Sequence, residues 1–161
     1  MGLDLPKKRK MVGDASFWKR GIAFLIDLLI IDFAIASPFS DIILSKVPDP
    51  QDYDFLMSNP EITNQIVLIF VVIMLLAFVY FVLFDYLLQQ TPGKMLTKLY
   101  VKPEKKKAKI SLLQCIIRNL AILPVFPFII LWAVDPVFIL LKNRRLSEIW
   151  SKTKTIEVYL I

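Results

Sequence analysis

Charged side chains interrupt the long apolar stretches of this sequence, and they are the residues whose chemistry suggests a function. Asp27 and Asp32 lie in the first stretch, and Arg118 and Asp135 lie in the third. An ionised side chain near the middle of a bilayer costs at least ~2.5–3.5 kcal/mol on insertion scales, so each of these groups needs a partner or water. Two roles follow: ion pairs that join helices, or a carboxylate site for protons and cations.

Arg118 cannot lose its charge by deprotonation, so it requires an anion unless it lies at the membrane interface. We expect Asp27 and Asp135 to be its partners. Arg20 precedes Asp27 by two helical turns on nearly the same face, and we expect it to extend to the lipid headgroups. Asp85 stands near the end of the second stretch, where we expect it to face water or headgroups.

Asp135 is followed by Pro136, which would remove one helical hydrogen bond and free the carbonyl of Trp132. A carboxylate beside a freed carbonyl resembles the broken-helix ion sites of transporters, where oxygen ligands suit hard cations. A kink that only serves packing is the alternative.

Composition narrows the class of protein. The 161 residues are 57% hydrophobic, include no histidine and contain the single cysteine Cys115; the mean hydropathy is +0.61. A soluble enzyme, a disulfide framework and His-based chemistry are thereby excluded. Motifs for nucleophilic catalysis or phosphate binding are also missing, so we expect no enzyme, no resident metal and no cofactor.

The apolar runs predict an all-α fold, a small polytopic helical membrane protein. A spanning helix needs roughly 20 apolar residues, and residues 21–39 and 66–88 each meet that requirement. A cleaved signal peptide is the alternative for the first run. We expect a basic tail over residues 1–15 and a membrane domain over residues 16–161. Its predicted helices span about 17–39, 66–88, 111–122 and 125–141.

The third run, residues 112–141, is too long for a single untilted crossing, since 30 helical residues measure about 45 Å. Pro124, Pro127 and Pro136 interrupt it. We therefore expect either a broken hairpin that returns to the side on which it began, which we favour, or one kinked span.

Charge sets the expected orientation, because positive segments stay in the cytoplasm. Residues 1–20 carry six Lys/Arg and two Asp, for a net charge of +4, and residues 89–111 have a net charge of +6. Residues 142–161 have a net charge of +3, whereas residues 40–65 have −4. A multi-pass cell-membrane protein with a cytoplasmic N-terminus is expected. The basic runs over residues 7–10 and 105–107 would attract anionic lipids, and no aromatic residues interleave these two runs as nucleic-acid binding would require.

Two segments alternate in the manner of strands. Residues 98–101 and 155–159 contain β-branched and aromatic residues at alternate positions. They would pair as a small cytoplasmic sheet if both lie on one side of the membrane; two unrelated tails are the alternative.

Three short motifs follow one another along the chain. They are the Arg-x-x-Ala-Phe-x-x-Asp of Arg20, Ala23, Phe24 and Asp27, the turn Thr91-Pro92-Gly93-Lys94, and the pair Arg118-Asn119. Over about residues 16–158, this arrangement resembles the RDD family of small membrane proteins.

One motif departs from the family pattern. The family's Asp-x-x-Ala-Gly-Thr corresponds here to Glu148, Ser151, Lys152 and Thr153. The negative charge is kept at Glu148, but one more methylene displaces the carboxylate, and close packing at the Ala-Gly pair is lost.

The resemblance implies two functions of different classes. One is a cation/proton exchanger that acts as an oligomer. In it, a proton and a monovalent cation compete for Asp27, Arg118 tunes that competition, and Asp135 is a second carboxylate. The other is a non-catalytic membrane scaffold or assembly factor whose intramembrane charges pair with one another or with partner helices.

Overall fold

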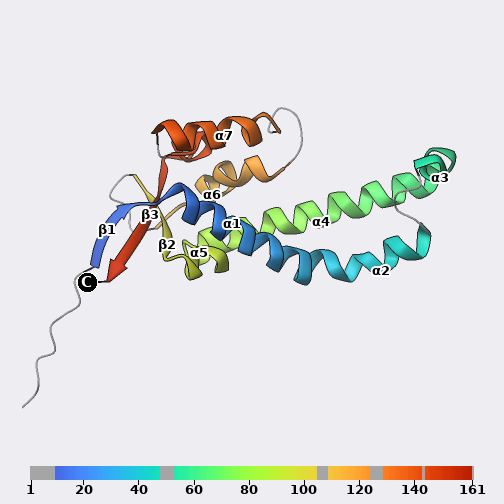
Figure 1. The fold of residues 1–161 in the computed structure, drawn as a ribbon, viewed down its shortest axis with the longest axis horizontal. Coiled ribbons are helices and arrows are strands. Elements are labelled where there is room, and N and C mark those ends of the chain that lie inside the picture. Colours follow the sequence, from blue (N-terminus) through green and yellow to red (C-terminus); the bar gives the residue numbers. More distant parts are fainter. Residues whose placement is uncertain (1–9, 48–52, 105–108, 124–128, 143, 161) are drawn as a thin grey trace, which may run out of the picture.

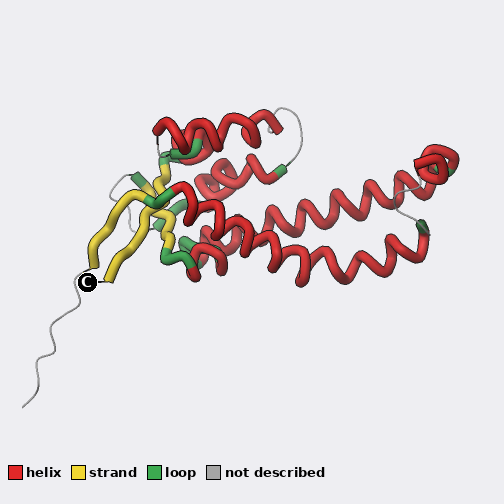
Figure 2. Tube along the Cα trace, viewed as in Figure 1, coloured by secondary structure: helices red, strands yellow, loops and turns green. Residues whose placement is uncertain are grey.

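A long helical hairpin dominates the computed structural model, with shorter helices along one side and a small sheet at one end (Figure 1). Figure 2 shows all strands at that end, whereas the far half of the hairpin is helical. We refer to the two regions as the sheet end and the far end. The structure describes residues 10–47, 53–104, 109–123, 129–142 and 144–160.

The first arm of the hairpin is one continuous helix of 30 residues. It comprises α1 (Phe17–Ile31), the π-helical segment η1 (Asp32–Ala36) and α2 (Ser37–Lys46). It extends past the predicted end at residue 39 because no Gly or Pro follows until Pro48, whose ring disfavours helical geometry at the preceding residue.

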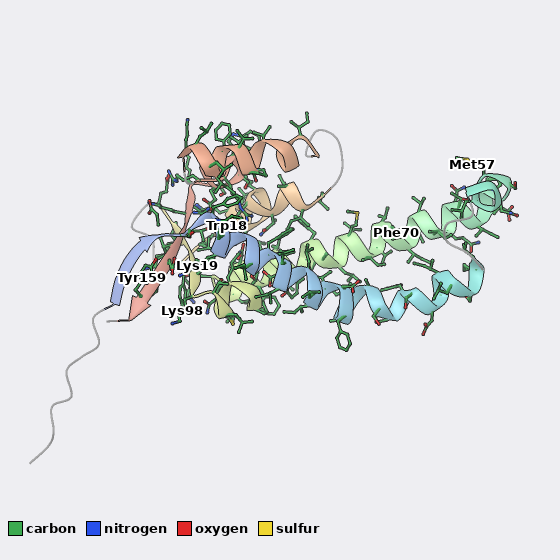
Figure 3. All side chains as sticks on the ribbon, in the orientation of Figure 1. Trp18, Lys19, Met57, Phe70, Lys98 and Tyr159 are labelled. Atoms are coloured by element: carbon green, nitrogen blue, oxygen red, sulfur yellow. The ribbon has the colours of Figure 1, made fainter. Side chains whose placement is uncertain are left out.

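The second arm is α4 (Pro60–Leu87), and α3 (Tyr53–Ser58) lies at the far end between the arms. In the most apolar part of each arm, few residues are buried within the protein: 17% in the first arm and 11% in the second. Apolar side chains such as Phe70 project outward (Figure 3). Both arms are therefore long and apolar enough to cross a membrane.

The third apolar run forms two helical pieces. They are α6 (Leu112–Asn119) with the 3-10 turn η2 (Leu120–Ile122), and α7 (Ile129–Lys142). Both α6 and α7 contact α8 (Leu146–Trp150) at the sheet end, so the chain returns toward its starting point. The expected bend at Pro124 and Pro127 lies outside the described residues. Neither described piece has the length that a crossing requires.

A three-stranded antiparallel sheet joins three distant parts of the chain. Its strands are β1 (Lys10–Asp14), β2 (Leu99–Pro103) and β3 (Thr153–Leu160), in the order β1-β3-β2. The predicted pairing of β2 with β3 is confirmed, with Leu99 opposite Glu157 and Val101 opposite Thr155. Strand β1 lies within residues 1–15, for which we expected only a basic tail.

The short helix α5 (Pro92–Leu96) packs against α1 at the sheet end. Its N-cap is Thr91, whose hydroxyl accepts a hydrogen bond from the Lys94 amide, and Pro92 occupies the first helical position. Contact with α1 is close at Gly93: a Cβ built there would lie 2.1 Å from the carbonyl oxygen of Ala23.

Replacing Gly93 with alanine is expected to destabilise the protein by several kcal/mol. The added methyl group would overlap the α1 backbone and would lie 2.9 Å from Cγ of Asp27, so α5 would have to move away. Thermal unfolding in detergent, followed by circular dichroism, measures the loss.

Gly21→Ala is the matched control, since a Cβ at this helical position meets nothing within 4 Å. It is expected to be neutral or to stabilise α1 by up to about 1 kcal/mol. Equal effects of the two substitutions would contradict the close packing of α5 on α1.

Candidate functional site

Buried charges from five helices converge at the sheet end. Arg20, Asp85, Lys94, Arg118 and Glu148 come from α1, α4, α5, α6 and α8 respectively. We call these five residues the charge cluster. Asp85 and Glu148 are fully buried, and the two arginines are nearly so. The cluster joins elements from almost the whole length of the chain.

Glu148 is the carboxylate that both arginines share. The Arg20 guanidinium donates to its two oxygens at 3.0 and 3.1 Å, and Nη2 of Arg118 lies 3.4 Å from Oε1. The hydroxyl of Thr155 also donates to Glu148. Burial alone would raise the pKa of Glu148, but Arg118, Arg20 and the nearby Arg145 lower it to about 2. The group is therefore ionised at neutral pH.

Asp85 is the second carboxylate of the cluster. Nζ of Lys94 donates to Oδ1 at 2.6 Å, and Asn119 donates to Oδ2 at 3.2 Å. Nε of Arg118 is 3.3 Å from Oδ2. Burial lowers the pKa of Lys94, and the attraction of Asp85 opposes that shift. The expectation that Asp85 faces water or headgroups is wrong, because helices α5 and α6 cover it.

Arg118 bridges the two carboxylates, and its remaining donors bind hydroxyls. It donates to Thr153 at 3.2 Å and to Thr155 at 2.8 Å. The predicted partners, Asp27 and Asp135, were wrong: Arg118 pairs with Asp85 and Glu148.

Arg20 does not extend to headgroups, as we had expected. It is 3% exposed and also donates to the backbone carbonyls of Ala15 and Thr155, at 3.2 and 3.4 Å. Its side chain therefore joins the start of α1 to both α8 and β3.

Asp27 holds α5 and α4 against α1. Its carboxylate accepts from the Tyr80 hydroxyl at 3.1 Å, from the Thr91 hydroxyl at 2.5 Å and from the Gly93 amide at 2.8 Å. Because the last two groups follow the end of α4, Asp27 lies level with the sheet end. Three donors from this chain thus occupy the carboxylate.

The other two predicted carboxylates are separate from the cluster. Asp135 accepts from the Leu146 amide at 2.9 Å and the Ser147 hydroxyl at 3.3 Å, so it ties α7 to the first turn of α8. Asp32 is exposed in η1 and belongs to the outer surface of the hairpin. No group of His, Cys, Asp and Glu among the described residues has an arrangement that could hold a metal ion.

A small cavity of about 30 Å³ lies beside the cluster. Such a volume admits a water molecule or two. Its ionisable lining is mostly cationic: Arg20, Lys94, Arg118 and Arg145 face it, with Asp27 as the carboxylate. Since Asp85 and Glu148 neutralise three of these cations, Asp27 is the carboxylate that the cavity lining could offer a cation, and three donors of this chain already bind it.

The segment that departs from the family pattern has a clear geometry. Lys152 follows the C-cap of α8, Ser151, and adopts a left-handed backbone with φ 52°. The family's glycine at this position suits that conformation. The Ser151 hydroxyl is buried, donates to the Ser147 carbonyl at 2.8 Å and lies 2.8 Å from the hydroxyl of Thr153. Serine thus contributes hydrogen bonds that alanine cannot form.

Lys152→Gly is expected to stabilise the protein by about 1 kcal/mol, because a left-handed residue with a Cβ carries a steric cost. Chemical unfolding in detergent provides the measurement. Lys152→Ala is the control, since it removes the same charge and keeps a Cβ. If the glycine variant were no more stable than the alanine variant, backbone strain at Lys152 would be refuted.

Sequence reasoning selected Arg118 and Asp27 but missed the role of Asp85 and Lys94 in the cluster. These two residues are nine positions apart, with a turn between them, so helical spacing could not pair them. Asp85 as the lone charge in an otherwise apolar run, residues 66–88, was the signal available.

Comparison with known proteins gives one match. The family model described as "RDD family" matches residues 14–150, which include the entire charge cluster. No curated protein and no solved structure matches this chain.

Proposed function

Since the chain belongs to the RDD family, and since two of its helices are long and apolar enough to cross a membrane, we propose that it is a non-catalytic membrane scaffold. In this role the sheet end is a rigid base, and the apolar hairpin is the surface that meets a partner membrane protein or a second copy of the chain. The observation that carries the proposal is the mutual neutralisation of the buried charges within one chain.

The buried carboxylates already have partners within this chain, which supports a structural role for the cluster. Asp85 and Glu148 each contact two cationic side chains of this chain, and Asp27 accepts three hydrogen bonds. Breaking a buried ion pair by removing one partner costs about 3–5 kcal/mol, so titration of these groups during a transport cycle would endanger the fold.

We further propose a cell-membrane location with the sheet end in the cytoplasm. The three segments with net positive charge, residues 1–20, 89–111 and 142–161, each contribute a strand to one sheet. The acidic segment, residues 40–65, includes α3 at the opposite end. Under the positive-inside rule, this separation supports a multi-pass protein with a cytoplasmic N-terminus.

The cation/proton exchanger is the second candidate, and one observation favours it. Asp27 borders the water-sized cavity, so a proton could reach this carboxylate. The three hydrogen bonds that Asp27 accepts argue against a monovalent metal ion at the same carboxylate.

A flux assay distinguishes the scaffold from the exchanger. It uses purified protein in sealed vesicles with an imposed proton gradient. The scaffold predicts that adding Na⁺ leaves the gradient unchanged, for the wild type and for Asp27→Asn alike. A pH-sensitive dye inside the vesicles gives the readout, and Asp32→Asn, an exposed carboxylate on the same arm, is the matched control.

Dissipation by the wild type that Asp27→Asn abolishes and Asp32→Asn preserves would establish the exchanger and overturn the scaffold. The scaffold also requires association: in mild detergent, the protein should purify with a stoichiometric membrane protein or as an oligomer. A monomer without a partner would count against the proposal.

A further inference from the structure

An apolar groove runs along the hairpin beside the charge cluster. It has a volume of about 350 Å³, within the range of about 300–1,000 Å³ typical of small-molecule sites. Its walls come from α1, α4, η2 and α7. On α1 the lining residues are Phe24, Leu28 and Ile31, which extend about 10 Å along the helix from the sheet end toward the far end.

The groove adjoins the small cationic cavity. Phe24 and Phe81 line both spaces, and their stacked rings, with centroids 6.2 Å apart, stand between them. Arg145 also lines both spaces. A ligand in the groove would thus have its apolar part along the helices and one end beside a guanidinium.

Arg145 is the guanidinium at that end of the groove, and the carboxylates of Glu148 and Asp135 act on it electrostatically. None of the ion pairs formed among the described residues involves it, whereas its neighbour Arg144 pairs with Glu104. Asp135 also lines the groove, but its two oxygens accept hydrogen bonds from the Leu146 amide and the Ser147 hydroxyl. These neutral donors leave the charge of Asp135 in place, and Arg145 is the cationic residue among those that line the groove.

We propose that the groove binds one anionic phospholipid, with an acyl chain between α1, α4 and α7 and the headgroup phosphate on Arg145. The guanidinium of Arg145 selects this occupant, because cationic side chains between membrane helices attract anionic headgroups. The position agrees with the depth of a headgroup, because Arg145 is the N-cap of α8, the helix that follows α7 and contacts β3. The site goes beyond the scaffold role and stands whatever the flux measurement gives.

Native mass spectrometry of the full chain in detergent tests the site with phosphatidylglycerol and phosphatidylcholine of identical acyl chains. The wild type is expected to retain one phosphatidylglycerol about five- to tenfold more strongly than phosphatidylcholine, the effect of one or more kcal/mol at a single charge. Equal retention of the two lipids by the wild type would overturn the proposal without need of any variant.

Arg145→Gln is expected to abolish the preference for phosphatidylglycerol. Arg144→Gln is the matched control, since it removes the same charge one residue away from a side chain that lines neither space. The same loss of preference in both variants would show a general effect of surface charge and would overturn the headgroup assignment.

Leu28→Trp is expected to reduce retention of both lipids by partly filling the groove. Leu29→Trp is the control, because Leu29 is 69% exposed and lies outside the groove. If Leu28→Trp and Leu29→Trp retained the lipids equally well, the placement of the acyl chain in the groove would be overturned. Dimers that hold no lipid, and that only Leu28→Trp converts to monomers, would show that a second copy occupies the groove instead.

Discussion

Ionised groups that are withdrawn from water must neutralise one another, and this constraint determines how the sheet end is assembled. Glu148 requires Arg20 and Arg118, and Asp85 requires Arg118 and Lys94. Because each partner comes from a different helix, the pairs can form only when α1, α4, α5, α6 and α8 meet at one place. The pairs thereby specify an arrangement that apolar packing alone would leave degenerate.

The two ends of the molecule differ in what holds them together. At the sheet end, hydrogen bonds and ion pairs connect the helices to the three strands, and Asp27 holds α5 within van der Waals contact of α1. Toward the far end, the two arms expose most of their apolar surface. A polar base with an apolar extension agrees with the scaffold that we propose, and the groove at the junction is the site that we propose for a lipid.

Much of this architecture could be predicted from the sequence. Hydropathy located both arms of the hairpin, and alternation offered the pairing of β2 with β3 as one of two alternatives. Strand β1 was missed because Lys10–Asp14 adjoins a run of basic residues that indicates a solvated tail. The ion-pair partners in the cluster were harder to predict: Glu148 lies outside every apolar run, and the family pattern that singles it out does not indicate which cations it binds. Only the fold brings it beside Arg118.

The structure also explains the positions at which this chain departs from the family pattern. Glu148 keeps the charge that two arginines require, and its longer side chain still reaches both. Lys152 keeps a left-handed backbone that glycine would adopt more readily. Ser151 adds hydroxyl contacts to the same turn. The local chemistry changes while the connection between α8 and β3 stays the same.

A double-mutant cycle on Arg20 and Glu148 tests the central claim most directly. The free energies of unfolding in detergent of Arg20→Met, Glu148→Met and the double variant are compared with that of the wild type. Mutual neutralisation predicts that the double variant loses less stability than the two single losses combined, by about 1–3 kcal/mol, as residues in direct contact do. Losses that add to within about 0.5 kcal/mol would show that the two charges are independent, and would contradict the account.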